Sequence, residues 1–131
     1  MLSLKIEVGM TGTVDSLVER ADTAAEVGSG SLLVYATPCM AALMEGAACE
    51  AIESGLDEGE TTVGIALDLQ HTAATPVGMD VTATAEVTAV DGKIITFSIT
   101  ASDEAGTIGT AIHKRAVVNA QRFLDKTYAK L

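Results

Sequence analysis

The stretch TPCMAALMEGAACEAIESG, residues 37–55, constrains the fold of this chain more than any other. Thr37 and Pro38 are typical of a helix start, because a threonine hydroxyl can accept a bond from a free first-turn N–H and proline suits the first helical position. Gly55 is typical of the left-handed residue that ends a helix. The residues between them are small or apolar on nearly every side, which indicates a helix buried in the core.

Glu45 is the exception to this apolar pattern. It lies about 140° around the helix from Glu50, so it is not on the acidic side of the helix. A carboxylate in apolar surroundings must be paired, hydrogen-bonded or shifted toward its neutral form. Glu45 is therefore a candidate functional residue, although a narrow exposed strip or a subunit contact explains it about equally well.

Most of the remaining chain alternates apolar and polar residues, which is typical of half-buried strands. This alternation predicts a strand over residues 4–18 with a bend at Gly12, a loop over 19–30, and strands over 61–71, 81–89, 94–101 and 107–118. Asp91-Gly92 is a hairpin signal, a second turn is expected at 103–106, and residues 119–129 suit a short closing helix. In the strand at 61–71, the inward side chains are expected to be Val63, Ile65, Leu67, Leu69 and His71.

One long buried helix with about five strands, three of them a consecutive antiparallel meander, is an α+β domain. The sheet must curl around the helix, because nothing else in the chain could cover its apolar surface. This arrangement is called a hot-dog fold. The length of 131 residues suits a single domain over residues 1–131.

The composition excludes several classes of function. The net charge of −10 argues against non-specific nucleic-acid binding and against anionic membrane surfaces. Neither a signal peptide nor an apolar run of membrane-spanning length is evident. Cys39 and Cys49 would lie roughly 15 Å apart along one helix, too far for a disulfide. A reduced cytoplasmic protein without metal or cofactor is expected, because no metal-ligand spacing and no nucleotide-binding motif occurs.

His71 is expected to point inward, toward the helix that carries Glu45. Taken alone, a hydrogen-bonded structural histidine is the favoured interpretation by roughly two to one. Thr37 adds a hydroxyl beside the backbone N–H groups of a helix start, which can polarise a carbonyl. Hydroxyl, carboxylate, imidazole and helix N-terminus together are what acyl transfer to water requires.

His113, Lys114 and Arg115 form a second candidate group, near the end of the last strand. One interpretation is an exposed sheet edge, which basic side chains often protect from aggregation. The other is a phosphate contact, since three potential cations stand together in an acidic chain. The sequence favours neither.

With these residues in place, the sequence resembles the hot-dog thioesterases of the fluoroacetyl-CoA thioesterase-like family from about residue 5 to 124. The resemblance rests on ATPCMAALME (36–45), TTVG (61–64), HTAATPVG (71–78), the Asp-Gly turn (91–92) and IGTAIHKRAVV (108–118). It implies a homodimer with active sites near the subunit interface that hydrolyses acyl-CoA thioesters, the coenzyme A being part of the substrate.

The resemblance also assigns roles to individual residues. It implies that Thr37, Glu45 and His71 are catalytic and that Gly64 brings bare backbone beside the acyl group. Arg115 matches an arginine of the family's last strand, whereas Lys114 departs from the acidic residue often found before it. With His113, these two basic residues are the expected substrate contacts.

A further departure concerns the acyl group. Fluoroacetyl-selective members resemble one another in carrying phenylalanines ahead of the ATP-like segment, whereas residues 27–34 here read VGSGSLLV. The resemblance therefore implies thioesterase chemistry without fluoroacetyl selectivity. Within that chemistry, Glu45 orients water or attacks as a nucleophile, and Thr37 positions, polarises or is itself acylated.

Two other functions remain open on the sequence. A hot-dog dimer can bind an acyl-CoA or a small acid without turning it over. A hot-dog enoyl-CoA hydratase or dehydratase is the other, although its Asp–His pairing is not evident, because Asp68 points to the opposite strand face from His71. Pairing of dimers into tetramers through the threonine-rich outer sheet face is also open.

Overall fold

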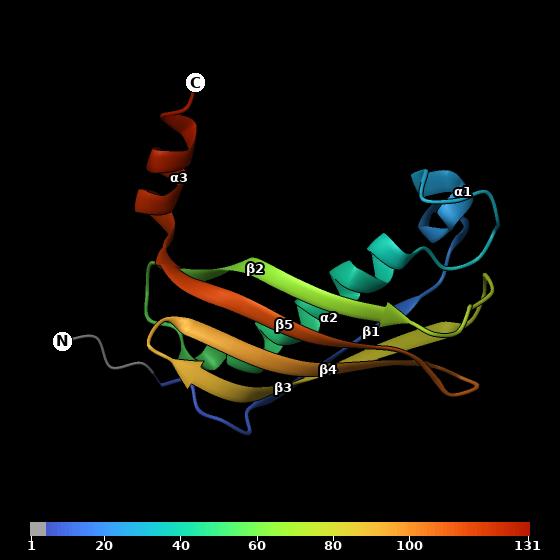
Figure 1. Ribbon diagram of the computed structural model, residues 1–131, viewed down its shortest axis with the longest axis horizontal. Helices are drawn as coiled ribbons and strands as arrows, with labels where there is room; N and C mark the ends of the chain where they lie inside the picture. Colours follow the sequence, from blue (N-terminus) through green and yellow to red (C-terminus); the bar gives the residue numbers. More distant parts are fainter. Residues whose placement is uncertain (1–4) are drawn as a thin grey trace.

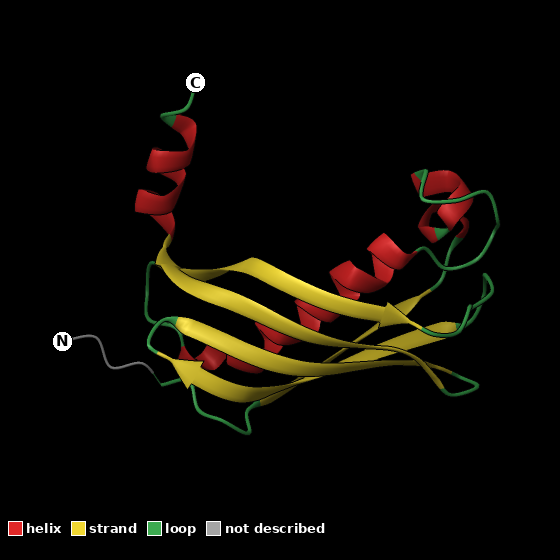
Figure 2. Cartoon of the chain, in the orientation of Figure 1, coloured by secondary structure: helices red, strands yellow, loops and turns green. Residues whose placement is uncertain are grey.

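A single antiparallel sheet curls around the helix α2 (Thr37–Ile52) in the computed structural model, which describes residues 5–131 (Figures 1 and 2). The strands are β1 (Thr11–Leu17), β2 (Glu60–His71), β3 (Asp80–Asp91), β4 (Ile94–Asp103) and β5 (Thr107–Asn119). The other helices are α1 (Ala24–Val27), α3 (Ala120–Tyr128) and the one-turn helices η1 (Arg20–Asp22) and η2 (Glu53–Gly55). Among the described residues, no helix has the length and apolarity to cross a membrane.

The strand order is β1-β3-β4-β5-β2, and every neighbouring pair is antiparallel. The meander β3-β4-β5 therefore lies in the middle, and β1 and β2 form the two edges. The predicted hot-dog arrangement of one helix inside a curled sheet is confirmed.

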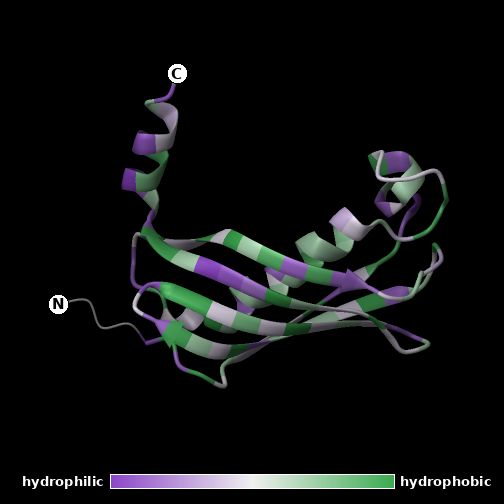
Figure 3. Ribbon diagram, viewed as in Figure 1, coloured by the Kyte–Doolittle hydropathy of each residue, from purple (hydrophilic) through white to green (hydrophobic). Residues whose placement is uncertain are grey.

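The inner face of the meander supplies most of the core. The predicted alternation is confirmed for most of β3 and β4, whose buried side chains are Val81, Ala83, Ala85, Val87, Ile95, Phe97, Ile99 and Ala101. The inward position expected of Ala89 is wrong, because the register of β3 shifts between Val87 and Ala89 and Ala89 is exposed. Bands of alternating hydropathy along these strands are visible in Figure 3. The hairpin turn is shifted by one residue from the prediction, because Asp91 still pairs with Ile94 and the loop is Gly92-Lys93, with Gly92 at φ 60°.

The helix α2 buries one face and exposes the other. Its buried residues are Met40, Met44, Ala47, Ala48, Ala51 and Ile52, whereas Ala42 and Cys49 are exposed. The prediction of a helix apolar and buried on all sides is thus wrong for one side. Its ends also differ, since Ala36 is the N-cap and Gly55 has no positive φ. Gly55 instead lies in η2, where a Cβ would come within 2.8 Å of Ile6.

A bulge in β2 changes which of its side chains face the helix. Gly64 pairs with Arg115 and Ala66 with Lys114, so Ile65 is an extra residue in the ladder. As a result Ile65 is 52% exposed, and the predicted inward orientation of Val63 and Ile65 is wrong. Before the bulge it is Thr62 that is buried, at 8% exposure.

The structure of the first thirty residues differs from the prediction in three places. Residues 5–10 lie outside β1 although Ile6 is buried, and Leu4 lies outside the described residues. Gly12 is not a bend, because it pairs with Ala85 inside β1. The predicted loop at 19–30 contains η1 and α1.

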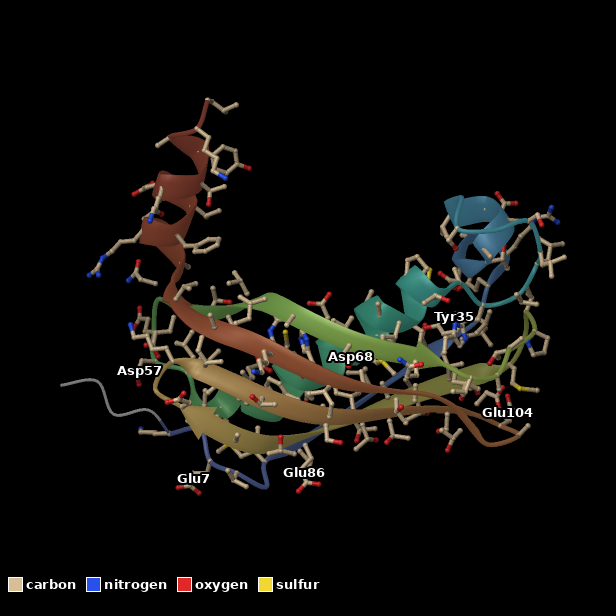
Figure 4. All side chains as sticks on the ribbon, viewed as in Figure 1. Glu7, Tyr35, Asp57, Asp68, Glu86 and Glu104 are labelled. Atoms are coloured by element: carbon tan, nitrogen blue, oxygen red, sulfur yellow. The ribbon has the colours of Figure 1, made fainter. Side chains whose placement is uncertain are left out.

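The predicted closing helix is confirmed as α3. Asn119 caps it by accepting a hydrogen bond from the Arg122 N–H, and the helix projects away from the sheet (Figure 1). Acidic side chains lie around the periphery of the molecule, as Glu7, Asp57, Glu86 and Glu104 illustrate in Figure 4.

Candidate active site

Thr37 and His71 meet where the start of α2 approaches the end of β2. The Thr37 hydroxyl and His71 Nδ1 are 2.7 Å apart and share a hydrogen bond. Thr37 is available for this contact because it is the first residue of α2 rather than its cap. The other ring nitrogen, His71 Nε2, is buried and has no hydrogen-bond partner among the described residues. A hydroxyl bonded to an imidazole whose second nitrogen is free is an arrangement suited to proton transfer.

This pair borders a pocket of about 280 Å³ beside the start of α2. Ser29, Val34 and Tyr35 contribute to its wall, together with Ala24 and residues 72–74. Figure 4 labels Tyr35 near this end of the helix. Burial, with smaller effects of Cys39 and Asp22, raises the pKa of Tyr35 to about 12, so the phenol stays neutral at pH 7. The pocket is therefore lined by the Thr37–His71 pair on one side and by apolar and hydroxyl-bearing side chains on the other.

The start of α2 offers one free backbone donor. Pro38 has no N–H, and the N–H groups of Cys39 and Met40 both donate to the Ala36 carbonyl. The Thr37 N–H has no acceptor among the described residues, and it belongs to the first residue of α2, at the helix N-terminus, where developing negative charge is stabilised. The oxyanion donor expected from several first-turn N–H groups is thus reduced to one.

Glu45 lies two turns further along α2 and forms an ion pair with Arg115. The Arg115 Nη1 donates to Glu45 Oε2 at 2.9 Å, and the Glu45 side chain is 42% exposed. Gly64 faces this pair across from β2, where a Cβ would lie 2.6 Å from Glu45 Oε2. Gly64 thus lies beside Glu45, and the missing side chain makes room for the Glu45 carboxylate.

Arg115 and His113 are held on the inner face of β5, whereas Lys114 is exposed on the other face. Arg115 also donates to the Thr62 hydroxyl and carbonyl, at 2.8 and 3.0 Å. The prediction of an exposed edge is wrong, because β5 lies between β4 and β2. The alternative, a phosphate contact, stays a prediction, but its premise of three cations standing together is wrong, since alternation puts Lys114 on the opposite face from His113 and Arg115.

His113 is buried beside Arg115 and Glu45. Its Nδ1 contacts the Ala66 carbonyl at 2.8 Å, and its Nε2 lies 3.2 Å from Arg115 Nη1 and 3.8 Å from Glu45 Oε2. Burial is the main cause that lowers the pKa of His113, and the Arg115 charge lowers it further, whereas the Ala66 bond and Glu45 act in the opposite direction. A neutral imidazole is therefore favoured here.

The chain thus forms two clusters, Thr37 with His71 and Glu45 with the inner basic residues of β5. Eight residues separate Thr37 from Glu45 on α2, which corresponds to about 12 Å along the helix axis. Thr62 and Ala66 take part in the second cluster, although the sequence singled out neither and Thr62 appeared only within the TTVG motif (61–64). The bulge at Ile65 turns Thr62 inward, and simple alternation of β2 cannot reveal a bulge. In residues 5–131, no group of three His, Cys, Asp or Glu side chains is placed to hold a metal ion.

Comparison with known proteins identifies a family for this chain. Residues 18–121 match the model of the family described as fluoroacetyl-CoA-specific thioesterase (FlK). A fluoroacetyl-CoA thioesterase of Streptantibioticus cattleyicolor is 40% identical over 97 residues, which cover 74% of this chain and 70% of the relative.

Solved structures are similar over nearly the whole chain. A structure of the fluoroacetyl-CoA thioesterase FlK superposes with a TM-score of 0.90 at 34% identity, covering 96% of this chain and 98% of that one. A hot-dog-like protein from Thermanaerovibrio acidaminovorans gives a TM-score of 0.85 at 25% identity, covering 95% and 92%. With the sequence match over most of its length, the chain belongs to the fluoroacetyl-CoA-specific thioesterase family of hot-dog proteins.

Proposed function

We propose that this protein hydrolyses acyl-CoA thioesters to the free acid and CoA, with Thr37, His71 and Glu45 as catalytic residues. The observation that carries the proposal is the Thr37–His71 hydrogen bond at the edge of a pocket, with His71 Nε2 free. Membership of a thioesterase family favours an enzyme over a non-catalytic binding module.

In the proposed reaction, the thioester carbonyl oxygen approaches the Thr37 N–H at the start of α2. His71 accepts a proton from the attacking hydroxyl as the new C–O bond forms, and returns a proton to the thiolate as the C–S bond breaks. The attacking oxygen belongs to Thr37 or to water. In the first case an acyl ester of Thr37 forms, and water then hydrolyses it to release the acid and restore the hydroxyl. In the second case no acyl-enzyme forms, so the mass of the protein during turnover distinguishes the routes.

Glu45 and its surroundings complete the proposed site. Because about 12 Å separates the two clusters along one helix, Glu45 is proposed to act on a thioester held by the Thr37–His71 pair of a second copy. There its free oxygen, Oε1, orients the attacking water, while Arg115 fixes Oε2. Gly64, Arg115, His113 and Lys114 remain proposed substrate-side residues, the first three through the Glu45 cluster and Lys114 from the outer face. No cofactor is proposed beyond the coenzyme A of the substrate.

We do not propose selectivity for fluoroacetyl-CoA. Residues 27–34 contain no aromatic side chain. The pocket wall carries Val34 and Tyr35, which suit a small to medium acyl group.

A cytoplasmic homodimer is part of the same proposal. The edge strand β2 has twelve residues, one side of α2 is uncovered, and Thr37 and Glu45 both belong to that helix. A second copy placed over β2 and α2 would cover both candidate clusters. The hydratase alternative is less favoured, because Asp68 is exposed and does not accompany His71 on the inner face.

The experiment that tests the proposal is incubation with a panel of short, branched, aromatic and long acyl-CoAs. Free CoA and free acid are followed by chromatography, because a thiol dye would also react with the exposed Cys49. We expect both products, and a loss of about 10² or more in turnover for His71→Ala and Glu45→Gln with unchanged circular dichroism. Intact thioesters with bound ligand would favour the binding module, and loss of the enoyl double bond would favour the hydratase.

A further inference from the structure

His113 lies in a fully enclosed site between three elements of the fold. It is 1% exposed and its ring lies 5.9 Å from that of Phe97, centroid to centroid. From β2 it meets the Ala66 carbonyl, from α2 the Glu45 carboxylate, and on its own strand Arg115. The proposed reaction uses Glu45 directly and includes His113 only as a member of the Glu45 cluster, without a step of its own.

The neighbours of His113 determine which ring nitrogen carries the proton. A carbonyl oxygen can only accept, so Nδ1, at 2.8 Å from the Ala66 oxygen, must carry a hydrogen. A guanidinium can only donate, so Nε2, at 3.2 Å from Arg115 Nη1, must present a lone pair. The two contacts are satisfied together by the neutral Nδ1–H tautomer alone.

This lone pair completes the restraint on Arg115. Of the five guanidinium N–H groups, four have acceptors, namely the Thr62 hydroxyl, the Thr62 carbonyl, Glu45 Oε2 and His113 Nε2. The two hydrogens of Nη1 therefore go to Glu45 and His113. Because both hydrogens of Nη1 are bonded, the guanidinium has a fixed orientation, and it holds Glu45 Oε2 in one place.

The bulge of β2 makes this network possible. It places the Ala66 carbonyl against His113, and it puts Gly64 where a Cβ would lie 3.4 Å from the ring and 2.6 Å from Glu45 Oε2. Glu45 is thus guided by Arg115 on one side and by bare backbone on the other. Its Oε1 has no partner among the described residues and is left for the substrate side.

We propose that His113 is a positioning residue: its neutral Nδ1–H form holds Arg115 so that Arg115 fixes one oxygen of Glu45 and leaves the other free for the reaction. The catalytic part of this inference rests on the proposed thioesterase function. The positioning of Arg115 does not, and it can be measured in the resting protein.

Protonation of His113 would reverse its contact with Arg115. Nε2–H would then face an N–H of Nη1, and the nearest available acceptor is Glu45 Oε2 at 3.8 Å. Glu45 and Arg115 are the charged groups that face the ring, since β2 contributes Gly64 and Ala66 and β4 contributes Phe97. Imidazolium and guanidinium would compete for one carboxylate oxygen, and the single position of Glu45 would be lost.

Two variants separate positioning from mere packing. His113→Gln keeps an amide oxygen that can accept from Arg115, whereas His113→Leu has similar bulk without an acceptor. On the best substrate of the acyl-CoA panel, we expect His113→Leu to lose about 10- to 100-fold in kcat with little change in KM. His113→Gln should keep most of the wild-type kcat. Equal loss in the two variants, or wild-type kcat in a folded His113→Leu, would overturn the proposal.

A second measurement does not depend on turnover. Long-range proton–nitrogen NMR of histidine-labelled protein at pH 7 should show His113 as the neutral Nδ1–H tautomer. The guanidinium signals of Arg115 should report slow rotation in wild type and His113→Gln, and faster rotation in His113→Leu. An Nε2–H tautomer, or Arg115 rotation that ignores the substitution, would refute the inference. If the wild type released no CoA, the proposed function would fail while this measurement still decided the role of His113.

Discussion

At the scale of single residues, the Thr37 hydroxyl has one described partner, His71 Nδ1, at 2.7 Å. Replacing Thr37 by Val removes the hydroxyl at nearly constant volume, whereas Ser retains it. We expect Thr37→Val to lose about 10² or more in kcat, because His71 loses its orienting bond and any covalent route loses its nucleophile. Thr37→Ser should stay within about tenfold of wild type, which is a smaller change than a lost proton-transfer partner produces. Similar steady-state rates for Val and Ser would exclude a role for the hydroxyl.

Gly64 offers a test at the other cluster. An alanine Cβ would lie 2.6 Å from Glu45 Oε2, the mobile end of a side chain, and 3.3 Å from Arg115 Nη1. The carboxylate can move away, so we expect Gly64→Ala to fold normally but to lose about 10-fold or more in kcat as Glu45 leaves its position. Thermal unfolding and turnover should be measured on the same sample. A large fall in Tm without a specific loss of kcat would contradict this account.

At the scale of elements, local patterns carried the prediction where they were sufficient. The meander follows from alternation and turn residues close in sequence, and Ile95, Phe97 and Ile99 face the core as expected. The bulge at Ile65 does not follow, because an extra residue is defined only by the strand that lies opposite. The inward position of His71 was predicted correctly because alternation resumes after the bulge.

The order of the strands in the sheet is the second feature that the sequence pattern did not predict. His113 was assigned with Lys114 and Arg115 to an exposed edge or a phosphate contact. The ladders of β5 with both β4 and β2 bury it instead. Thr37, Glu45 and His71 could be singled out from residue type and context. Their grouping into two clusters depends on long-range packing, which cannot be predicted from the pattern of a single sequence.

Two glycines of the core elements make a matched pair. A Cβ on Gly12 of β1 would lie 2.3 Å from the Ala51 nitrogen and 2.5 Å from the Ala47 carbonyl, both backbone atoms of α2. A Cβ on Gly46 would meet Val14 at an ordinary 3.9 Å. We expect Gly12→Ala to lower the free energy of unfolding by at least about 2 kcal/mol, since strand or helix must shift. Gly46→Ala should raise it by about 0.5–1 kcal/mol through helix propensity. Urea unfolding measures both, and equal effects would show that β1 does not rest on the helix backbone.

At the scale of the whole molecule, two groups should shape the dependence of stability on pH. Burial lowers the pKa of folded His113, so the unfolded chain binds its proton more readily, and stability should fall as pH drops below about 6.5. The bond from Thr75 is the main cause that lowers the pKa of Asp103, with the Ala105 and Gly106 N–H groups adding to it. Its contribution should be lost as pH drops below about 3.9.

Urea unfolding between pH 8 and pH 3 can separate these two windows. His113→Gln should flatten the curve below about pH 6.5, the ordinary histidine value, and leave the acid end unchanged. Asp103→Asn should reduce only the fall in stability below about pH 3.9, because the variant has no carboxylate to protonate there. A wild-type curve that is flat between pH 7 and pH 5 would contradict the assignment of His113 as a buried neutral imidazole.

Assembly is the last property of the whole chain that can be tested sharply, because two isoleucines match in exposure but lie on different surfaces. Ile65 belongs to the bulge of edge strand β2 and is 52% exposed, and Ile112 lies in the inner strand β5 and is 51% exposed. A lysine at position 65 would place a charge where the second copy is proposed to dock. We expect the wild type to sediment as a dimer of 13.4 kDa chains, and Ile65→Lys to sediment as a monomer with reduced turnover.

Ile112→Lys should change neither property if dimers are the final assembly. If this variant instead converts a wild-type tetramer to dimers, a second interface lies on the outer sheet face. A monomeric wild type with full turnover would show that the two clusters of one chain suffice for the reaction.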